Sequence, residues 1–245
     1  MKAFTEFVTE RKLTLQFHQE LNPKFWDEND SLDPLVRSKI LEIAEAWRDY
    51  AKIPKSAVKD IYMLGGNCNY NYTRYSDVDI HLVVDMDKIS SDKDLLFDYF
   101  MDKKNLWSND YNVTIYGYPV EIFAQSYLDE PKEGQGVYSV KKDEWIQKPS
   151  KEDLSRYRKV QINHKVTFYK ALINKAIKGE ATADEVHKLK EKIRTMRKAG
   201  IEQGGEYAFE NLVFKELRNR GLLDKLNDYK IKVIDTELSL GEYDE

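Results

Sequence analysis

The chain has 245 residues, of which 41% are hydrophobic, 12% aromatic and 33% charged. This length predicts one large domain or two smaller ones, and the aromatic and aliphatic content excludes an intrinsically disordered chain. The 11 glycines and 6 prolines exclude collagen-like and low-complexity sequence. The formal net charge is −4, so the total charge does not point to a nucleic-acid partner.

Two features of the sequence indicate the cellular compartment: the single cysteine and the first residues. Cys68 cannot form an intramolecular disulfide, whereas secreted domains usually carry an even set of cysteines. The first residues, MKAFTEFVTERKL, lack the apolar stretch of a signal peptide, and no segment approaches 18 consecutive apolar residues. We therefore expect a soluble, cytoplasmic protein with no membrane contact.

Residues 1–55 are predicted to form an N-terminal helical segment. The clearest helix is predicted over 33–52, because Asp33 can cap it and Pro34 occupies the first helical position. A shorter helix, ended by Asn22-Pro23, is suggested by Phe4, Phe7, Val8 and Leu15.

Residues 56–148 are predicted to form a small α/β module of about four strands. Apolar and β-branched runs predict strands over 61–64, 78–84, 112–115 and 120–123. A helix is predicted near Leu95 to Phe100, between the second and third strands. Gly65-Gly66 ends the first strand, and a turn at 116–119 joins the last two as a hairpin.

Residues 149–234 are predicted to form a C-terminal helical bundle, followed by an acidic tail at 235–245. The first helix follows Pro149-Ser150, whose spacing to Asp153 resembles a capping box. Apolar residues at helical spacing predict three helices, around 154–176, 186–196 and 209–217. Gly204-Gly205 is predicted to open the third helix.

Charge is unevenly distributed along the chain. Residues 151–200 contain 14 Lys or Arg and 6 Asp or Glu, a local charge of +8, so the rest of the chain carries −12. This basic stretch is a candidate surface for a polyanion such as RNA. The alternative is a set of amphipathic helices whose lysines are simply solvated.

Three acidic residues within strand-like sequence suggest a metal site. Side chains two apart on a strand share a face, so Asp77 and Asp79 would project together, with Cα atoms about 6.6–6.8 Å apart. Glu121 lies in a second apolar strand that a sheet can bring alongside. Carboxylates this close favour Mg²⁺, which also binds phosphate oxygens. The alternative is that one aspartate begins the strand and the other faces water at a sheet edge.

These motifs resemble the DNA polymerase β-type nucleotidyltransferase superfamily over roughly residues 60–125. The shared pattern is a strand ending in Gly65-Gly66, a gap of about ten residues, Asp77-Val78-Asp79 on the next strand, and the later Glu121. The overall layout is also similar to predicted nucleotidyltransferases of tailed phages, which share a C-terminal helix with Gly204-Gly205-Glu206. The implied fold is α+β: a small mixed-sheet palm flanked by the N-terminal helical segment and the C-terminal helical bundle.

The resemblance also implies a role for each motif residue. Asp77 and Asp79 would bind two Mg²⁺ or Mn²⁺ ions, and Glu121 would bind the catalytic ion and help deprotonate the acceptor. Gly66 stands where the family commonly has serine, and Asn67 is a candidate to replace that hydroxyl. The helix that usually follows the glycines is expected to be short or missing. The residues expected to contact the triphosphate are Gly65, Gly66, Asn67, Ser76, Arg156, Lys159 and Lys165.

The sequence therefore predicts a metal-dependent nucleotidyltransferase. It would transfer a nucleoside monophosphate from an NTP, with ATP the first candidate, to a hydroxyl of RNA, protein, a nucleotide or a small molecule, and release pyrophosphate. Two alternatives stay open: a non-catalytic nucleotide- or nucleic-acid-binding module with a degenerate transferase fold, and pyrophosphate transfer by the same fold. The presence of all three acids favours an enzyme.

Overall fold

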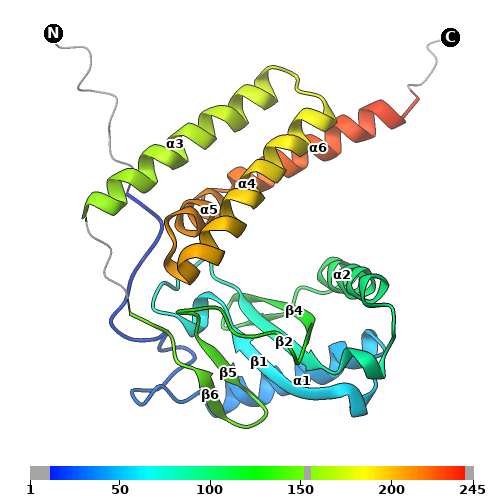
Figure 1. Cartoon of the computed structure of the whole chain (residues 1–245). Coiled ribbons are helices and arrows are strands. Elements are labelled where there is room, and N and C mark those ends of the chain that lie inside the picture. Colours follow the sequence, from blue (N-terminus) through cyan, green and yellow to red (C-terminus); the bar gives the residue numbers. More distant parts are fainter. Residues whose placement is uncertain (1–11, 152–155, 241–245) are drawn as a thin grey trace. The chain divides into compact units, whose positions relative to one another are not determined.

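The structure is a computed structural model that describes residues 12–151 and 156–240, without the side chains of Arg156 and Tyr157. In these residues the protein is α+β, with one six-stranded mixed sheet and six α-helices (Figure 1). None of the helices in the described ranges is both long and apolar enough to span a membrane.

The described chain forms two compact units. The sheet unit contains residues 16–151, so residues 16–55 belong with the strands. The helical unit contains residues 156–240 together with residues 12–15. Among the described residues, the sheet unit continues to residue 151, three residues beyond the end of the predicted core at 148.

Helix α1, Pro34–Tyr50, begins where the sequence predicts it. The Asp33 carboxylate accepts hydrogen bonds from the backbone N–H groups of Leu35 and Val36, which would otherwise lack partners in the first turn. The described residues 12–33 contain no helix, and the rest of the shorter helix predicted before Asn22 lies outside the described residues.

The sheet has the strand order β3-β4-β2-β1-β5-β6. Its strands are β1 Val58–Leu64, β2 Val78–Val84, β3 Thr114–Ile115, β4 Tyr118–Ser126, β5 Val137–Ser139 and β6 Glu144–Gln147. The first four correspond to the predicted strands. The sequence did not predict β5 and β6, because runs of three and four residues are too short to show a clear period.

Strands β2 and β4 are parallel neighbours in the centre of the sheet. Parallel neighbours need a long crossover, and helix α2, Lys93–Asp110, followed by β3 supplies it. Tyr116 and Gly117 then have φ of 50° and 82°, as a two-residue hairpin turn requires. This turn reverses the chain into β4.

The two faces of the sheet differ in character. Ile80, Leu82 and Ile122 are buried in the core, whereas the alternate residues Asp79 and Glu121 are partly exposed. Helices α1 and α2 share this core and touch one another, with 6.4 Å between the ring centroids of Trp47 and Phe100 and 5.2 Å between those of Tyr50 and Trp107. The carboxylates therefore lie on the face opposite the core.

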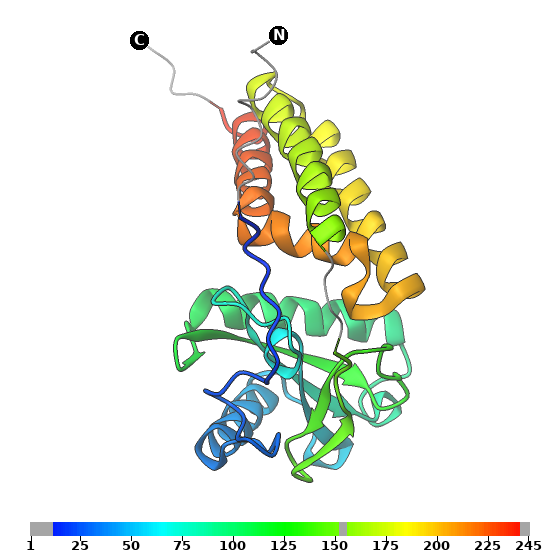
Figure 2. The same cartoon turned by 90° about the vertical axis from the view of Figure 1, so that its left-hand side faces the viewer.

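The helical unit contains α3, α4, α5 and α6, at Arg156–Lys178, Ala183–Gly204, Phe209–Asn219 and Leu222–Leu238. Helices α3, α4 and α6 lie alongside one another, and the shorter α5 packs across one end (Figure 2). Gly204 ends α4, and the predicted capping residue Asp153 lies outside the described residues.

Helix α6 corrects two predictions: that the C-terminal bundle has three helices, and that an acidic tail begins at residue 235. The helix continues to Leu238, with Leu222 and Leu226 buried. Asp235 and Glu237 therefore lie in its last turns rather than in a tail, and the described part of the tail is limited to residues 239–240.

A buried carboxylate attaches residues 12–15 to the helical unit. Glu216 of α5 is fully buried and accepts hydrogen bonds from the backbone N–H of Thr14 at 3.0 Å and that of Leu15 at 3.2 Å. Its charge is balanced by Arg220, whose Nε lies 2.6 Å from Oε1 of Glu216. These contacts explain why a segment from the chain start belongs to the C-terminal unit.

Candidate metal centre

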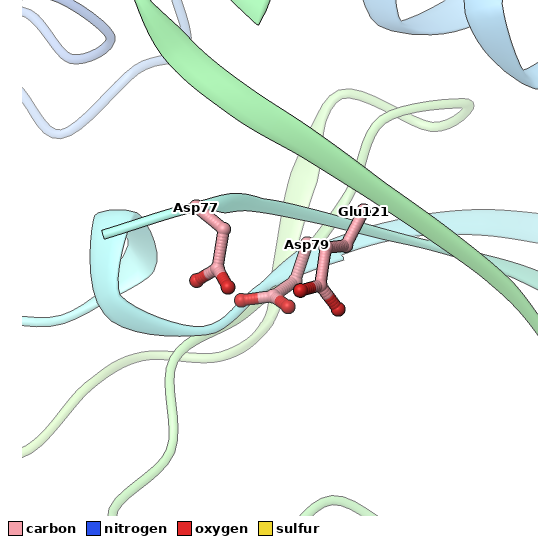
Figure 3. Close-up of side chains that lie close together, drawn as sticks. All are labelled: Asp77, Asp79 and Glu121. Atoms are coloured by element: carbon pink, nitrogen blue, oxygen red, sulfur yellow. The ribbon is translucent and has the colours of Figure 1, made fainter. Parts of the chain in front are cut away.

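Three carboxylates meet on the exposed face of the sheet. Asp79 of β2 and Glu121 of β4 are direct partners in the parallel register, and Asp77 immediately precedes β2. One oxygen from each of the three lies within 4.8 Å of the others, and the side chains point toward one another (Figure 3). The structure thus brings Glu121 together with Asp77 and Asp79, which the sequence predicted on another strand.

Gly65 makes room for one of these carboxylates. Its φ of 79° and ψ of −159° are disfavoured for residues with a side chain. A Cβ at this position would lie 1.6 Å from Oδ2 of Asp79. The glycine at the end of β1 is therefore required by the position of the Asp79 side chain.

Gly66 and Ser76 also lie in close contact. A Cβ on Gly66 would lie 2.7 Å from Oγ of Ser76, so a residue larger than glycine at this position would require Ser76 to move. Ser76 is buried, and its Oγ accepts a hydrogen bond from the backbone N–H of Thr73 at 3.0 Å. Gly66 begins a single 3-10 turn, Gly66–Cys68, and the sequence predicts that a helix at this place is short or missing.

Asn67 has a structural role in the protein, and its contact with a phosphate stays a prediction. Its side chain is fully buried and uses both ends of the amide within the protein. Nδ2 donates to the backbone carbonyl of Asp77 at 2.8 Å, and Oδ1 accepts from Asn22 at 2.8 Å. The indole N–H of Trp26 donates to the Asn67 carbonyl at 2.7 Å. Asn67 therefore holds the backbone that carries the first aspartate.

The next two residues complete this support. Asn69 donates from Nδ2 to the carbonyl of Gly65 and accepts the backbone N–H of Gly136 at 2.9 Å. Cys68 is fully buried between them, and burial, with a smaller effect from the nearby charge of Asp79, raises the pKa of its thiol well above the usual value. The thiol is therefore protonated and shielded from solvent at neutral pH.

Two further side chains border the carboxylates. Nζ of Lys104, on α2, lies 2.6 Å from Oε2 of Glu121. His81, two residues after Asp79, hydrogen-bonds to Gln125, and its burial lowers the pKa of the imidazole, which is therefore neutral at pH 7. Sequence reasoning missed Lys104, because α2 carries adjacent lysines and no local pattern shows which one reaches the sheet.

The predicted basic ligands belong to α3, in the helical unit. Lys165 lies over the rings of Phe168 and Tyr169, with Nζ 6.0 and 5.8 Å from their centroids. Lys159 is exposed, and the side chain of Arg156 lies outside the described residues. Contact between these residues and a triphosphate stays a prediction.

No family model, curated protein or solved structure matches the chain. The chemistry of the site is therefore argued from its donor atoms. Two of the three carboxylates lie on adjacent strands and the third immediately precedes one of them, and all three are partly exposed, hard oxygen ligands that suit Mg²⁺ or Mn²⁺. This donor set can hold a divalent cation next to an anionic substrate.

Proposed function

We propose that the protein is a metal-dependent nucleotidyltransferase, with the sheet unit as its catalytic palm. The observation that carries this proposal is the convergence of Asp77, Asp79 and Glu121, with the last two directly opposed in a parallel register. Gly65 and Asn67 further support it, because Gly65 leaves space for the Asp79 carboxylate and Asn67 donates a hydrogen bond to the Asp77 carbonyl.

Each residue of the site has a role in this proposal. Asp77 and Asp79 hold two Mg²⁺ or Mn²⁺ ions, and Glu121 holds one of them. Bound divalent ions neutralise phosphate charge and lower the pKa of a bound hydroxyl. Glu121 orients the acceptor hydroxyl and helps to remove its proton. The backbone at Gly65 and Gly66 lines the triphosphate.

The reaction is an in-line displacement at the α-phosphorus of an NTP. The acceptor oxygen forms the new bond to phosphorus while the bond to the β-phosphate oxygen breaks, so that pyrophosphate leaves. No covalent intermediate with the protein is needed, and catalysis depends on positioning and charge stabilisation. The basic stretch in α3 and α4 favours RNA as the acceptor.

The test is label transfer from α-³²P-labelled NTPs with Mg²⁺ or Mn²⁺ and an RNA or lysate mixture. We expect transfer by the natural protein and loss of transfer in the Asp77→Ala/Asp79→Ala variant. Asp85→Ala/Asp87→Ala is the matched control, because this second Asp-x-Asp lies after β2, where the two acids pair with lysines 59 and 93. That variant should transfer label normally.

Three outcomes separate the alternatives. Transfer that survives in Asp77→Ala/Asp79→Ala contradicts the proposed mechanism. Transfer of label from both β-³²P-labelled and γ-³²P-labelled NTP, but not from α-³²P-labelled NTP, indicates pyrophosphate transfer. NTP binding is measured as well, because a nucleotidyltransferase still binds NTP with metal when its acceptor is missing from the mixture. The absence of both transfer and such binding contradicts the proposed function and leaves a non-catalytic module that binds nucleic acid rather than NTP.

A further inference from the structure

Helix α2 places a cation directly at the candidate metal centre. Nζ of Lys104 lies 2.6 Å from Oε2 of Glu121, and the Lys104 side chain is 27% exposed. Phe97, two helical turns earlier, packs edge-on against Phe123 of β4, with 5.9 Å between ring centroids. Since Glu121 and Phe123 are alternate residues of one strand, one stripe of α2 follows the face that bears the carboxylates.

The neighbouring lysine shows that this position is specific. Nζ of Lys103 lies over the rings of Tyr50 and Tyr99, 5.2 and 5.4 Å from their centroids. Adjacent residues on a helix point about 100° apart, so only one of these two lysines can reach the acidic face. Lys104 is therefore held at the carboxylates by the packing of α2.

We propose that Lys104 is a positioning residue that holds Glu121 in the metal-free protein and competes with the divalent cation for its carboxylate. This inference rests on the proposed function, because it assumes that the three acids bind metal. An ammonium group and a divalent ion repel each other, and both bind carboxylate oxygens. Metal binding at this carboxylate therefore weakens the contact between Lys104 and Oε2 of Glu121.

This competition makes the affinity of the site for metal depend on bound nucleotide. Without substrate, the Lys104–Glu121 ion pair opposes binding of the free ion. A triphosphate brings negative charge that can bind the displaced ammonium, so that metal and nucleotide bind more readily together than the metal does alone. Lys104 thus raises the metal concentration needed to fill the centre in the absence of substrate.

The test is Mn²⁺ binding to the full chain without nucleotide, followed by electron paramagnetic resonance. We expect Lys104→Met to bind Mn²⁺ about two- to fivefold more tightly than the natural protein, a range typical of one partly exposed ion pair. Lys104→Arg, which keeps the charge, and Lys103→Met, which removes the neighbouring charge, should both remain near the natural affinity. Circular dichroism verifies that each variant is folded.

The outcomes separate this inference from the proposed function. A folded Lys104→Met variant with equal or weaker Mn²⁺ affinity overturns the competition, because a purely structural role for the ion pair would weaken the site. If the natural protein binds Mn²⁺ and Asp79→Asn abolishes that binding, the metal centre stands whatever the result for Lys104. If no variant binds Mn²⁺ through these acids, both proposals are overturned.

Discussion

Replacing Gly65 with alanine tests the geometry of the metal centre most directly. The new Cβ would lie 1.6 Å from Oδ2 and 2.7 Å from Cγ of Asp79, so the carboxylate must move. The backbone, with φ of 79°, also becomes strained, at a cost of about 1–3 kcal/mol. We expect Gly65→Ala to lower the free energy of unfolding by at least about 2 kcal/mol and to abolish Mn²⁺ binding.

Gly117→Ala separates the strain from the clash. Gly117 has a similar φ of 82°, but a Cβ there would have no neighbour within 4 Å. This control should show the backbone cost alone and bind Mn²⁺ normally. The assays are thermal unfolding and Mn²⁺ binding by electron paramagnetic resonance, applied to both variants.

A double-mutant cycle with Asp79→Ala completes the test. Asp79→Ala removes the two nearest atoms, so Gly65→Ala should cost less stability in that background than in the natural protein. A Gly65→Ala variant that binds Mn²⁺ as tightly as the natural protein would refute the reasoning, as would strictly additive stability losses.

Three further predictions concern the surroundings of the site and the stability of α1. Asn67→Ala should cost about 2–3 kcal/mol of unfolding free energy and weaken Mn²⁺ binding, because it leaves buried partners unpaired; unchanged stability by urea unfolding would contradict this. Cys68 should react with Ellman's reagent only on unfolding, so rapid labelling of the native protein would disprove its burial. Glu45 has a pKa lowered from 4.5 to about 2 by Arg48 and then Lys55, so its stabilisation is present above pH 4.5 and is lost as the pH falls toward 2. Because its side chain is half exposed, Glu45→Gln should cost less than about 1 kcal/mol at pH 7, and urea unfolding should show this difference disappearing at low pH.

The sequence by itself determined the elements that depend on short-range signals. Asp33 and Pro34 mark the start of α1, because capping involves only the next few backbone N–H groups. The β-branched run 78–84 predicts β2 with the same bounds as the structure. Strand alternation also places Asp77 and Asp79 on one face without reference to any partner strand.

Only the tertiary structure decided which side chains meet. The parallel register of Asp79 with Glu121 depends on a crossover of more than thirty residues through α2, which no local pattern specifies. The same crossover selects Lys104 rather than Lys103 for the acidic face. The hydrogen bond between Asn67 and Asn22 joins residues 45 apart in the sequence, so no local pattern shows it. Local propensity sets helices, strands and turns, whereas the site is made by long-range packing that a single sequence does not reveal.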